Sequence, residues 1–237
     1  MQTAKNIEPT DQPELQLVHP MKLWQGIFKP TSHFSTLRDA EQVKGLIWRV
    51  LLISLLAGIF TGFTTYLTME LNIIPNQKAI PGMDTAIMQN IVAISAGVGG
   101  LFTLPVYMLI AAAIYTIIFR DIPFGKQFAI QAYASFISLI NIAIAVPSLY
   151  LAKTVTPFFS LGIIGEALHA GPFLQALLST ITVFFIWQLI FTIIAIKQTT
   201  TKSSKYVVSW ILILNVIYLF ISAAIFNFST AVSNLSI

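Results

Sequence analysis

The sequence predicts an all-α, polytopic integral membrane protein: a bundle of five transmembrane helices with the N-terminus in the cytoplasm and the C-terminus outside. Three observations lead to this fold class. Hydrophobic residues make up 56% of the 237 residues and charged residues only 9%, whereas a soluble domain carries about 25% charged residues. The apolar residues gather in five stretches, each long enough for the helix of about 20 residues that crosses a bilayer. Basic residues are concentrated in alternate connecting segments, which is typical of multi-pass proteins.

The five apolar stretches predict helices rather than strands. Each is apolar on all sides, whereas strands of an outer-membrane barrel alternate apolar and polar residues over about ten residues. The second stretch contains Pro105 and is long enough to tilt or kink, and the third contains Pro147 near its end. No Asp, Glu, Lys, Arg or His lies in the cores of the stretches. The predicted transmembrane helices span residues 46–67, 91–119, 128–150, 173–196 and 207–228.

The distribution of basic residues predicts the orientation. Eleven of the thirteen lie on one side of a five-helix arrangement, in the segment up to Arg49 and in the two segments that follow the second and fourth helices. Only Lys78 and Lys153 lie on the other side. The positive-inside rule places the N-terminus in the cytoplasm, and we expect a bacterial cytoplasmic membrane. The net charge of +4 reflects this topology and contact with anionic lipid headgroups, so we expect no nucleic-acid partner.

Four regions are expected along the chain. Residues 1–20 are polar and contain prolines, which predicts a mobile cytoplasmic tail. Residues 21–45 form an interfacial amphipathic segment, residues 46–228 the five-helix membrane domain, and residues 229–237 a short outer tail. The apolar part of the outer segment 157–172 is too short to span a bilayer. An interfacial helix, a re-entrant turn and a cap on the outer mouth of the bundle are the alternatives for it.

The interfacial segment supplies the candidate interaction surface. The apolar residues of positions 23–28 recur at helical spacing. Pro30 is expected to end this short helix, and Thr31 or Ser32 to cap the next one. Such a surface can anchor the segment in the cytoplasmic leaflet or dock a partner protein, and both uses stay open. The surface consists of Trp24, Phe28, Pro30 and Phe34.

Small residues in the first two helices predict close helix packing. Gly58 and Gly62 form a G-x-x-x-G motif, and small residues four positions apart recur around Gly99. In a bilayer, burying apolar surface between helices gains little, because lipid solvates that surface equally well. Helices therefore associate through close backbone packing, which small residues permit. The contact is expected within the chain or with a second copy or another membrane protein. The candidate packing residues are Gly58, Gly62, Gly97, Gly99, Gly100 and Asn141.

Polar groups within the stretches are few. Asn141, Gln188 and Asn215 are the strongly polar side chains at depth, and we expect them to hydrogen-bond between helices, with contact to a small solute as the alternative. Intramembrane proteases need serine and histidine, paired aspartates or H-E-x-x-H within the membrane. Ion-coupled transporters usually keep ionisable residues there. We therefore expect no enzyme activity.

The composition also offers few residues that could bind a metal or another cofactor. The chain contains no cysteine, which excludes disulfides, thiolate zinc sites and iron–sulfur clusters. His19 and His33 precede the first helix, whereas His169 falls on the other side of the membrane in the predicted topology. These histidines cannot share a metal ion, so we expect neither a metal nor another cofactor.

Three short motifs carry a resemblance to a known family. The entry segment WQGIFKP, the glycine/basic loop FGKQF that leads into QAYAS, and a closing pattern of one tryptophan and one lysine resemble the Yip-domain family of five-span membrane proteins. The family also shares the predicted topology. The motifs lie at residues 24–30 with Phe34, at residues 124–128 and 131–135, and at Trp187 and Lys205.

The resemblance implies a function. The Asp-Leu-Tyr-Gly-Pro motif of the eukaryotic trafficking members is absent, so the chain is more similar to bacterial, YknW-type members. These members accompany an ABC exporter permease and its adaptor in resistance to a secreted toxic peptide. The resemblance thus implies a non-enzymatic accessory or scaffold protein whose partners are membrane lipids and other membrane proteins. A small-solute transporter or channel built around Pro105, Pro147 and Asn141 is the main alternative, and a membrane-trafficking factor is a further one.

Overall fold

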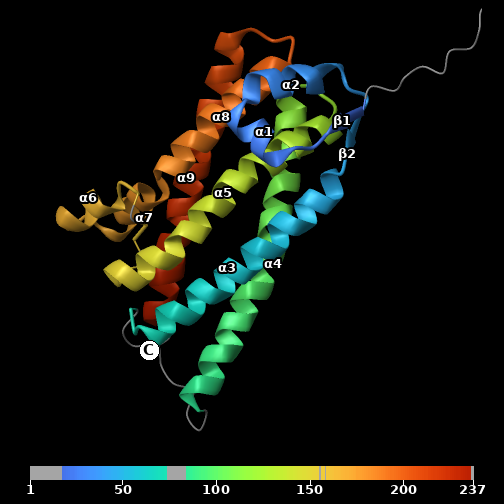
Figure 1. Ribbon diagram of the computed structural model, residues 1–237. Coiled ribbons are helices and arrows are strands. Elements are labelled where there is room, and N and C mark those ends of the chain that lie inside the picture. The colour runs from blue at the N-terminus through green and yellow to red at the C-terminus, as the bar shows by residue number, and fades with distance from the viewer. Residues whose placement is uncertain (1–17, 74–83, 155, 158, 236–237) are drawn as a thin grey trace, which may run out of the picture.

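Figure 1 shows a computed structural model of the protein, which describes residues 18–73, 84–154, 156–157 and 159–235. The expected tail up to residue 17 and part of the first outer loop lie outside these residues. The described chain is almost entirely helical, and four of its helices are long and apolar enough to cross a membrane. The predicted all-α membrane bundle is therefore confirmed. These helices are α3 (Leu46–Glu70), α4 (Thr85–Ile118), α5 (Phe124–Ala152) and α9 (Ser204–Leu235).

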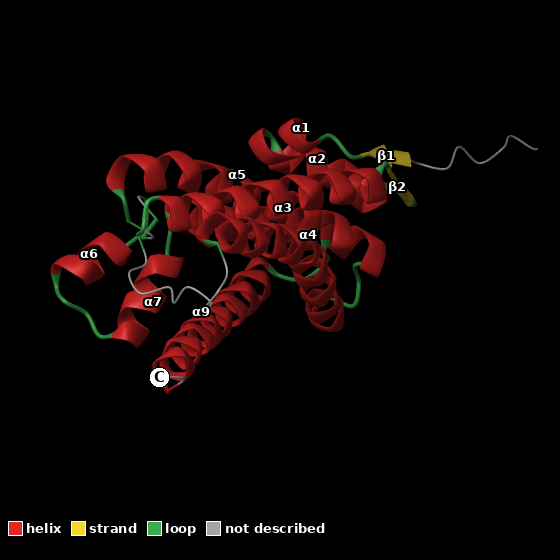
Figure 2. Ribbon diagram, turned by 90° about the horizontal axis from the view of Figure 1, so that it is seen from below, coloured by secondary structure: helices red, strands yellow, loops and turns green. Residues whose placement is uncertain are grey.

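The bundle is arranged around α5. Helix α3 packs along α4 and α5, and α5 also contacts α8 (Val183–Thr199). Helix α9 packs on α8 and on α7 (Pro172–Thr180), and it diverges from α3 and α4, as Figures 1 and 2 show. The C-terminal end of α9 lies at the opposite end of the bundle from α1 and α2 (Figure 1). The described bundle thus consists of four long apolar helices and the shorter α8.

The fourth predicted span is not one continuous helix, so this part of the prediction is wrong. It consists of α7 and α8, separated at Ile181 and Thr182. The break forms because the loop before α6 pairs with it: Leu161 N–H donates to the Ile181 carbonyl at 3.0 Å and Val183 N–H to the Phe159 carbonyl at 2.9 Å. Thr182 then caps α8 by accepting the Phe185 N–H at 3.0 Å. With 17 residues, α8 is about 25 Å long and shorter than a bilayer core.

The outer segment before this break forms a helical hairpin. Helix α6 (Gly162–Ala167) packs on α7, and α7 packs on α9. The contact is tight, because a Cβ atom on Gly162 would lie 2.9 Å from the Ser179 backbone. The Gln175 amide donates to the Gly162 carbonyl at 3.1 Å and closes the hairpin. The segment therefore contains a short helix that packs on α7.

Other helix ends also differ from the predictions: α4 begins six residues before the expected span, and α9 continues to Leu235, so that most of the expected outer tail 229–237 is helical. Helix α4 begins at Thr85 because Asp84 accepts the Ala86 N–H at 2.7 Å as its N-cap. Helix α5 begins directly after Pro123, and Pro105 and Pro147 lie inside helices. The apolar cores of the other four spans were therefore predictable, whereas the ends of their helices were not.

The segment before the bundle folds into a small cap. Helix α1 (Leu23–Phe28) packs on α5, and α2 (Pro30–Asp39) packs on α8. Pro30 is the first residue of α2, and its N-cap is Lys29, so the expected caps Thr31 and Ser32 are wrong. Proline suits this position because it lacks the N–H that a first helical turn leaves unpaired. A short parallel pair that the sequence pattern does not indicate, β1 (Val18–Pro20) and β2 (Gln42–Lys44), flanks the cap.

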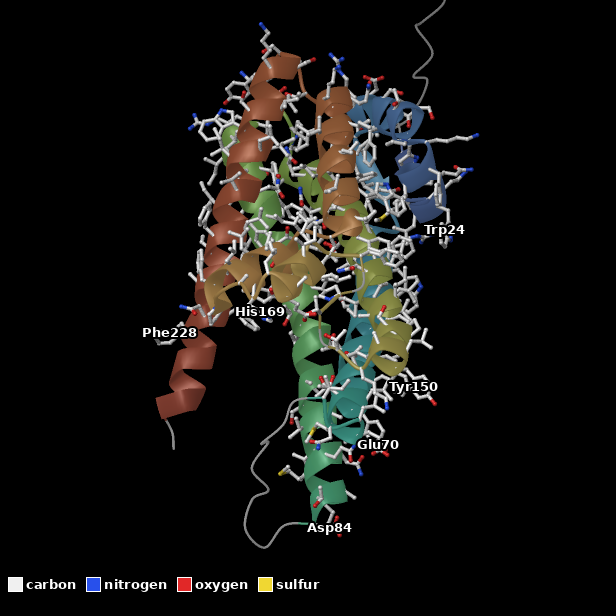
Figure 3. The ribbon with its side chains drawn as sticks, turned by 90° about the vertical axis from the view of Figure 1, so that its left-hand side faces the viewer. Trp24, Glu70, Asp84, Tyr150, His169 and Phe228 are labelled. Carbon is white, nitrogen blue, oxygen red and sulfur yellow. The ribbon has the colours of Figure 1, made fainter. Side chains whose placement is uncertain are left out.

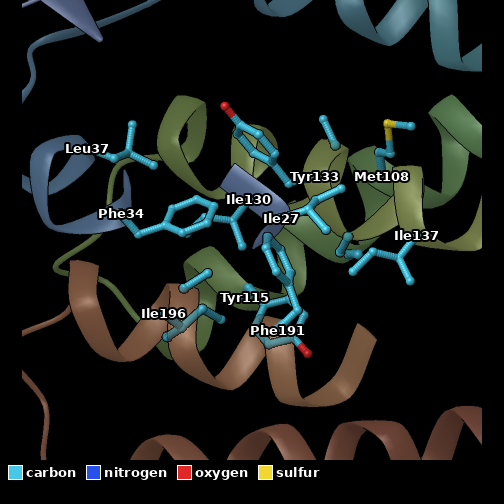
Figure 4. Close-up of a cluster of buried hydrophobic side chains, with 14 of the residues drawn as sticks. Ile27, Phe34, Leu37, Met108, Tyr115, Ile130, Tyr133, Ile137, Phe191 and Ile196 are labelled. Atoms are coloured by element: carbon cyan, nitrogen blue, oxygen red, sulfur yellow. The ribbon is translucent and has the colours of Figure 1, made fainter. Parts of the chain in front are cut away.

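The largest buried cluster lies where the cap meets the bundle (Figure 4). Phe34 and Leu37 of α2 are fully buried, as are Tyr133 of α5 and Phe191 of α8. The Phe34 ring centroid lies 5.3 Å from that of Tyr133 and 5.4 Å from that of Phe191, edge to face in both cases. Edge-to-face pairs of this kind add to the stabilisation from burial. The cap is therefore an integral part of the fold.

This cluster yields a stability prediction. Phe34→Ala should destabilise the folded protein by about 3–5 kcal/mol, because it leaves a cavity among packed rings. Phe28→Ala is the matched control, since Phe28 is 64% exposed, and it should cost far less. Thermal unfolding in mild detergent measures both. Equal losses for the two variants would contradict the burial of Phe34.

Candidate functional site

An aromatic patch lies on the outside of the cap. Trp24 and Phe28 are 62% and 64% exposed and stack with ring centroids 5.8 Å apart. Trp24 meets Phe136 of α5 edge to face at 5.5 Å, and Phe28 lies 6.1 Å from Trp187 of α8. We call these four residues the aromatic patch. Figure 3 shows Trp24 at the cap, with Tyr150, Glu70 and Asp84 farther towards the opposite end of the molecule.

Phe34 does not belong to this surface, so its place in the candidate interaction surface is wrong. The Phe34 ring packs on Tyr133 of α5 and Phe191 of α8 and does not face lipid or a partner. Next to it, His33 Nε2 and the Tyr133 hydroxyl hydrogen-bond at 2.6 Å. Pro30 is half-buried. Of the predicted surface, Trp24 and Phe28 remain fully available for contact.

Glycines join α3 and α4, as the sequence predicted. A Cβ atom on Gly58 would lie 2.8 Å from the Gly97 carbonyl oxygen, and one on Gly62 would lie 3.0 Å from that of Ala93. At Gly100 the nearest atom would be the Thr61 hydroxyl, at 2.8 Å. Any side chain at these positions would push the helices apart. The packing partner is therefore the chain itself.

Gly99 is the exception among the predicted packing residues. A Cβ atom there would meet nothing within 4 Å, and the residue is exposed. Gly97 and Gly99 are two positions apart and hence lie on opposite faces of α4. The expectation that Gly99 packs within the chain is wrong.

The polar residues at depth behave in different ways. Ser138 of α5 donates to Gln188 Oε1 of α8 at 2.8 Å, as predicted for an interhelical bond. Asn215 donates to the Ile211 carbonyl of its own helix at 2.8 Å and also interacts with Tyr115 of α4. Asn141 makes no side-chain hydrogen bond within the described part of the chain, so the interhelical bond expected of it is not found.

Asn141 instead faces a cavity of about 290 Å³ between α3, α5 and the loop after α5. Thr64 and Ser148 also line it, but their hydroxyls donate to carbonyls of their own helices, at 2.8 and 2.9 Å. The Asn141 amide is therefore free to bond whatever enters. The remaining polar lining comes from Thr68, Thr154 and Thr156.

A row of buried polar groups on α5 was missed. Gln127, Gln131 and Ser135 are almost completely buried, and at least one polar atom of each has no hydrogen-bond partner among the described residues. With Ser138 and Asn141 they recur every three or four positions and so share one face of α5. Buried polar groups without partners are uncommon in folded proteins. We call these five residues the polar stripe.

Asp121 ties two connecting segments together. Its Oδ2 atom accepts hydrogen bonds from the Thr200 hydroxyl and the Thr201 N–H, both at 2.6 Å, and from the Thr201 hydroxyl at 2.9 Å. Burial by itself would raise the pKa of this carboxyl group, but these hydrogen bonds outweigh it and lower the pKa below its ordinary value. The segment between α4 and α5 is thereby fixed to the segment between α8 and α9.

The described residues contain no group of three or more His, Cys, Asp or Glu side chains that could hold a metal ion. Glu166 accepts a short hydrogen bond from the Thr156 hydroxyl. This carboxylate therefore stabilises the conformation of the outer loop.

The geometry defines a multi-pass membrane protein. Aromatic side chains pack its cap onto the bundle, and glycines pack α3 onto α4. The Yip1 domain family model matches residues 24–226, from the cap to the last helix. The chain therefore belongs to the Yip1 domain family. No curated protein and no solved structure matches it.

The glycine contact predicts a difference between two glycines that lie two positions apart on α4. Gly97→Leu should lower the unfolding temperature and the yield of folded protein, because overpacking a tight contact costs about 1–3 kcal/mol or more. Gly99→Leu is the matched control, since it makes the same change in the same helix where nothing lies within 4 Å. If Gly99→Leu were as damaging as Gly97→Leu, the assigned faces of α4 would be wrong.

The Asp121 contacts predict a pH dependence. The pKa of Asp121 is lower in the folded state, so its stabilisation is fully present above the unfolded value of about 4 and is lost as the pH falls through the folded value. The unfolding temperature of Asp121→Asn should therefore lie below that of the wild type at neutral pH, and the gap should close in acid. A gap that is constant with pH would contradict the assignment. Thr200→Val removes one of the hydroxyl groups that donate to Asp121 and so tests the same contact at the donor.

Proposed function

We propose that the protein is a non-enzymatic accessory or scaffold protein that assembles with other membrane proteins. One observation carries the proposal: α4 has two faces of small residues, and the chain itself covers only one. The covered face packs through Gly97 and Gly100 on α3. The other face, with Ser95, Gly99 and Thr103, is exposed.

The uncovered face of α4 has the character of a helix-docking surface. Ser95, Gly99 and Thr103 are four positions apart, so they align along the helix. Their side chains present no unpaired polar group, because Ser95 and Thr103 each donate to a carbonyl of α4 at 2.8 Å. Small residues aligned in this way allow close approach of a second transmembrane helix. A helix of another membrane protein fits this face.

The finer proposal concerns the partner. By resemblance to the bacterial, YknW-type members of the family, the partner would be the permease and adaptor of an ABC-type exporter in the cytoplasmic membrane. The aromatic patch supports a second contact, because Trp24 and Phe28 are exposed large apolar residues held by the rigid cap. A partner could thus engage α4 within the membrane and the patch at its surface.

A second candidate function is transport of a small uncharged solute. The observation that favours it is the polar stripe, which runs along α5 from Gln127 to Asn141 and ends at the cavity between α3 and α5. A transport route needs polar groups that replace the hydration of the solute. Solute flux in proteoliposomes that contain this chain alone would favour transport over assembly.

Co-purification tests the assembly role. The tagged chain is expressed in its native membranes, extracted in mild detergent and analysed for bound permease and adaptor. We expect Gly99→Leu to fold normally and to lower partner recovery about tenfold, the effect of losing about 1.4 kcal/mol of association. Ala224→Leu, which places the same leucine side chain at an exposed position of α9, is the control. Absence of any membrane protein from the wild-type eluate would refute assembly.

A further inference from the structure

A cleft of about 700 Å³ lies between α1, α3 and α5 at the end of the bundle that carries the cap. Its polar lining comes from Lys22, Gln25 and Arg49, and its aromatic walls include Trp24 and Trp48. Towards the bundle the lining is apolar. The cleft therefore joins two positive charges to an apolar surface that runs along α3.

The two cations in the cleft have no anionic partner within the part of the chain that the structure describes. The described residues contain no carboxylate bonded to the Lys22 ammonium or to the Arg49 guanidinium, although Arg49 is half-buried. A partly buried charge is costly unless an opposite charge pairs with it. The guanidinium lies close to the Gly45 backbone, since a Cβ atom on Gly45 would lie 2.9 Å from Arg49 Nη1. A ligand that bears a negative charge would satisfy both groups.

The surroundings of the cations point to a lipid. Trp24 and Trp48 are 62% and 71% exposed, and tryptophan favours the boundary between headgroups and hydrocarbon. Beyond Arg49, α3 exposes Leu52, Leu55 and Ile59, at 48%, 50% and 56%. This strip could accommodate an acyl chain of a lipid whose phosphate lies at the cations. A free phosphate ion would leave the tryptophans and the strip without a role.

We infer that this cleft binds an anionic phospholipid, with the phosphate group between Lys22 and Arg49 and an acyl chain along α3. The basic residues that predict the orientation place the cleft in the cytoplasmic leaflet, where anionic lipids attract basic side chains. A lipid held there would join the cap, through Lys22, to the first spanning helix, through Arg49. The inference does not depend on the assembly role proposed above.

Lipid retention tests the inference. Protein purified in mild detergent is mixed with phosphatidylglycerol or phosphatidylcholine, and bound lipid is counted by native mass spectrometry. We expect Lys22→Gln/Arg49→Gln to retain about thirtyfold less phosphatidylglycerol, since two basic contacts are removed. Lys202→Gln/Lys205→Gln is the matched control, because it removes two exposed charges outside the cleft, and it should retain the lipid as the wild type does. Equal retention by both double variants overturns the inference.

Two measurements on the wild type complete the test. Its unfolding temperature should rise more with phosphatidylglycerol than with phosphatidylcholine, and an equal rise overturns the inference even where the double variant fails to fold. Inorganic phosphate should neither raise the unfolding temperature nor displace the lipid at equal concentration. If phosphate stabilises as well as the lipid does, the site recognises a soluble phosphate and the lipid assignment is wrong.

Discussion

The packing of the N-terminal cap around Tyr133 is the contact on which the arrangement of this bundle depends. The ring fills the space where Gly26 of α1 would carry a Cβ atom, which would lie 2.4 Å from it. On α2, Phe34 meets the ring edge to face and His33 bonds its hydroxyl. Phe191 of α8 lies beside it at 6.4 Å. One side chain of α5 therefore joins both cap helices and α8 without any pairing of charges.

Away from this cluster, the spans depend on shape more than on burial. Lipid solvates apolar side chains as well as a neighbouring helix does, so close backbone contact and a few hydrogen bonds must hold the helices. The glycine contact between α3 and α4 and the Ser138–Gln188 bond between α5 and α8 supply these. Helices α9 and α4 diverge (Figure 2), although the Tyr206 hydroxyl donates to the Ile118 carbonyl at 3.4 Å and the rings of Tyr107 and Tyr218 meet edge to face. The faces that remain uncovered are open to lipid or to a partner.

The sequence predicted the helices because long apolar runs have one stable form in a membrane, but it could not predict which face each helix buries. An apolar residue that faces lipid and one that faces protein are identical in sequence, so Phe34 and Phe28 could not be told apart. The same holds for Gly97 and Gly99. The break at Thr182 depends on pairing with Phe159 and Leu161, and the bond between His33 and Tyr133 joins positions 100 residues apart. Contacts between residues so far apart leave no recognisable pattern in the local sequence.

The proposed lipid site gives a structural role to two of the basic residues near the start of the bundle, Lys22 of the cap and Arg49 of α3. Charge there fixes the orientation of the chain, but orientation alone requires no particular geometry. Lys22 and Arg49 nevertheless line one cleft, although 27 positions apart, because α1 folds back onto α5 beside the start of α3. The Tyr133 contact that holds α1 thus also brings the two cations together. Loosening this contact would separate the charges, so the packing of the cap and the binding of an anionic lipid should stabilise each other.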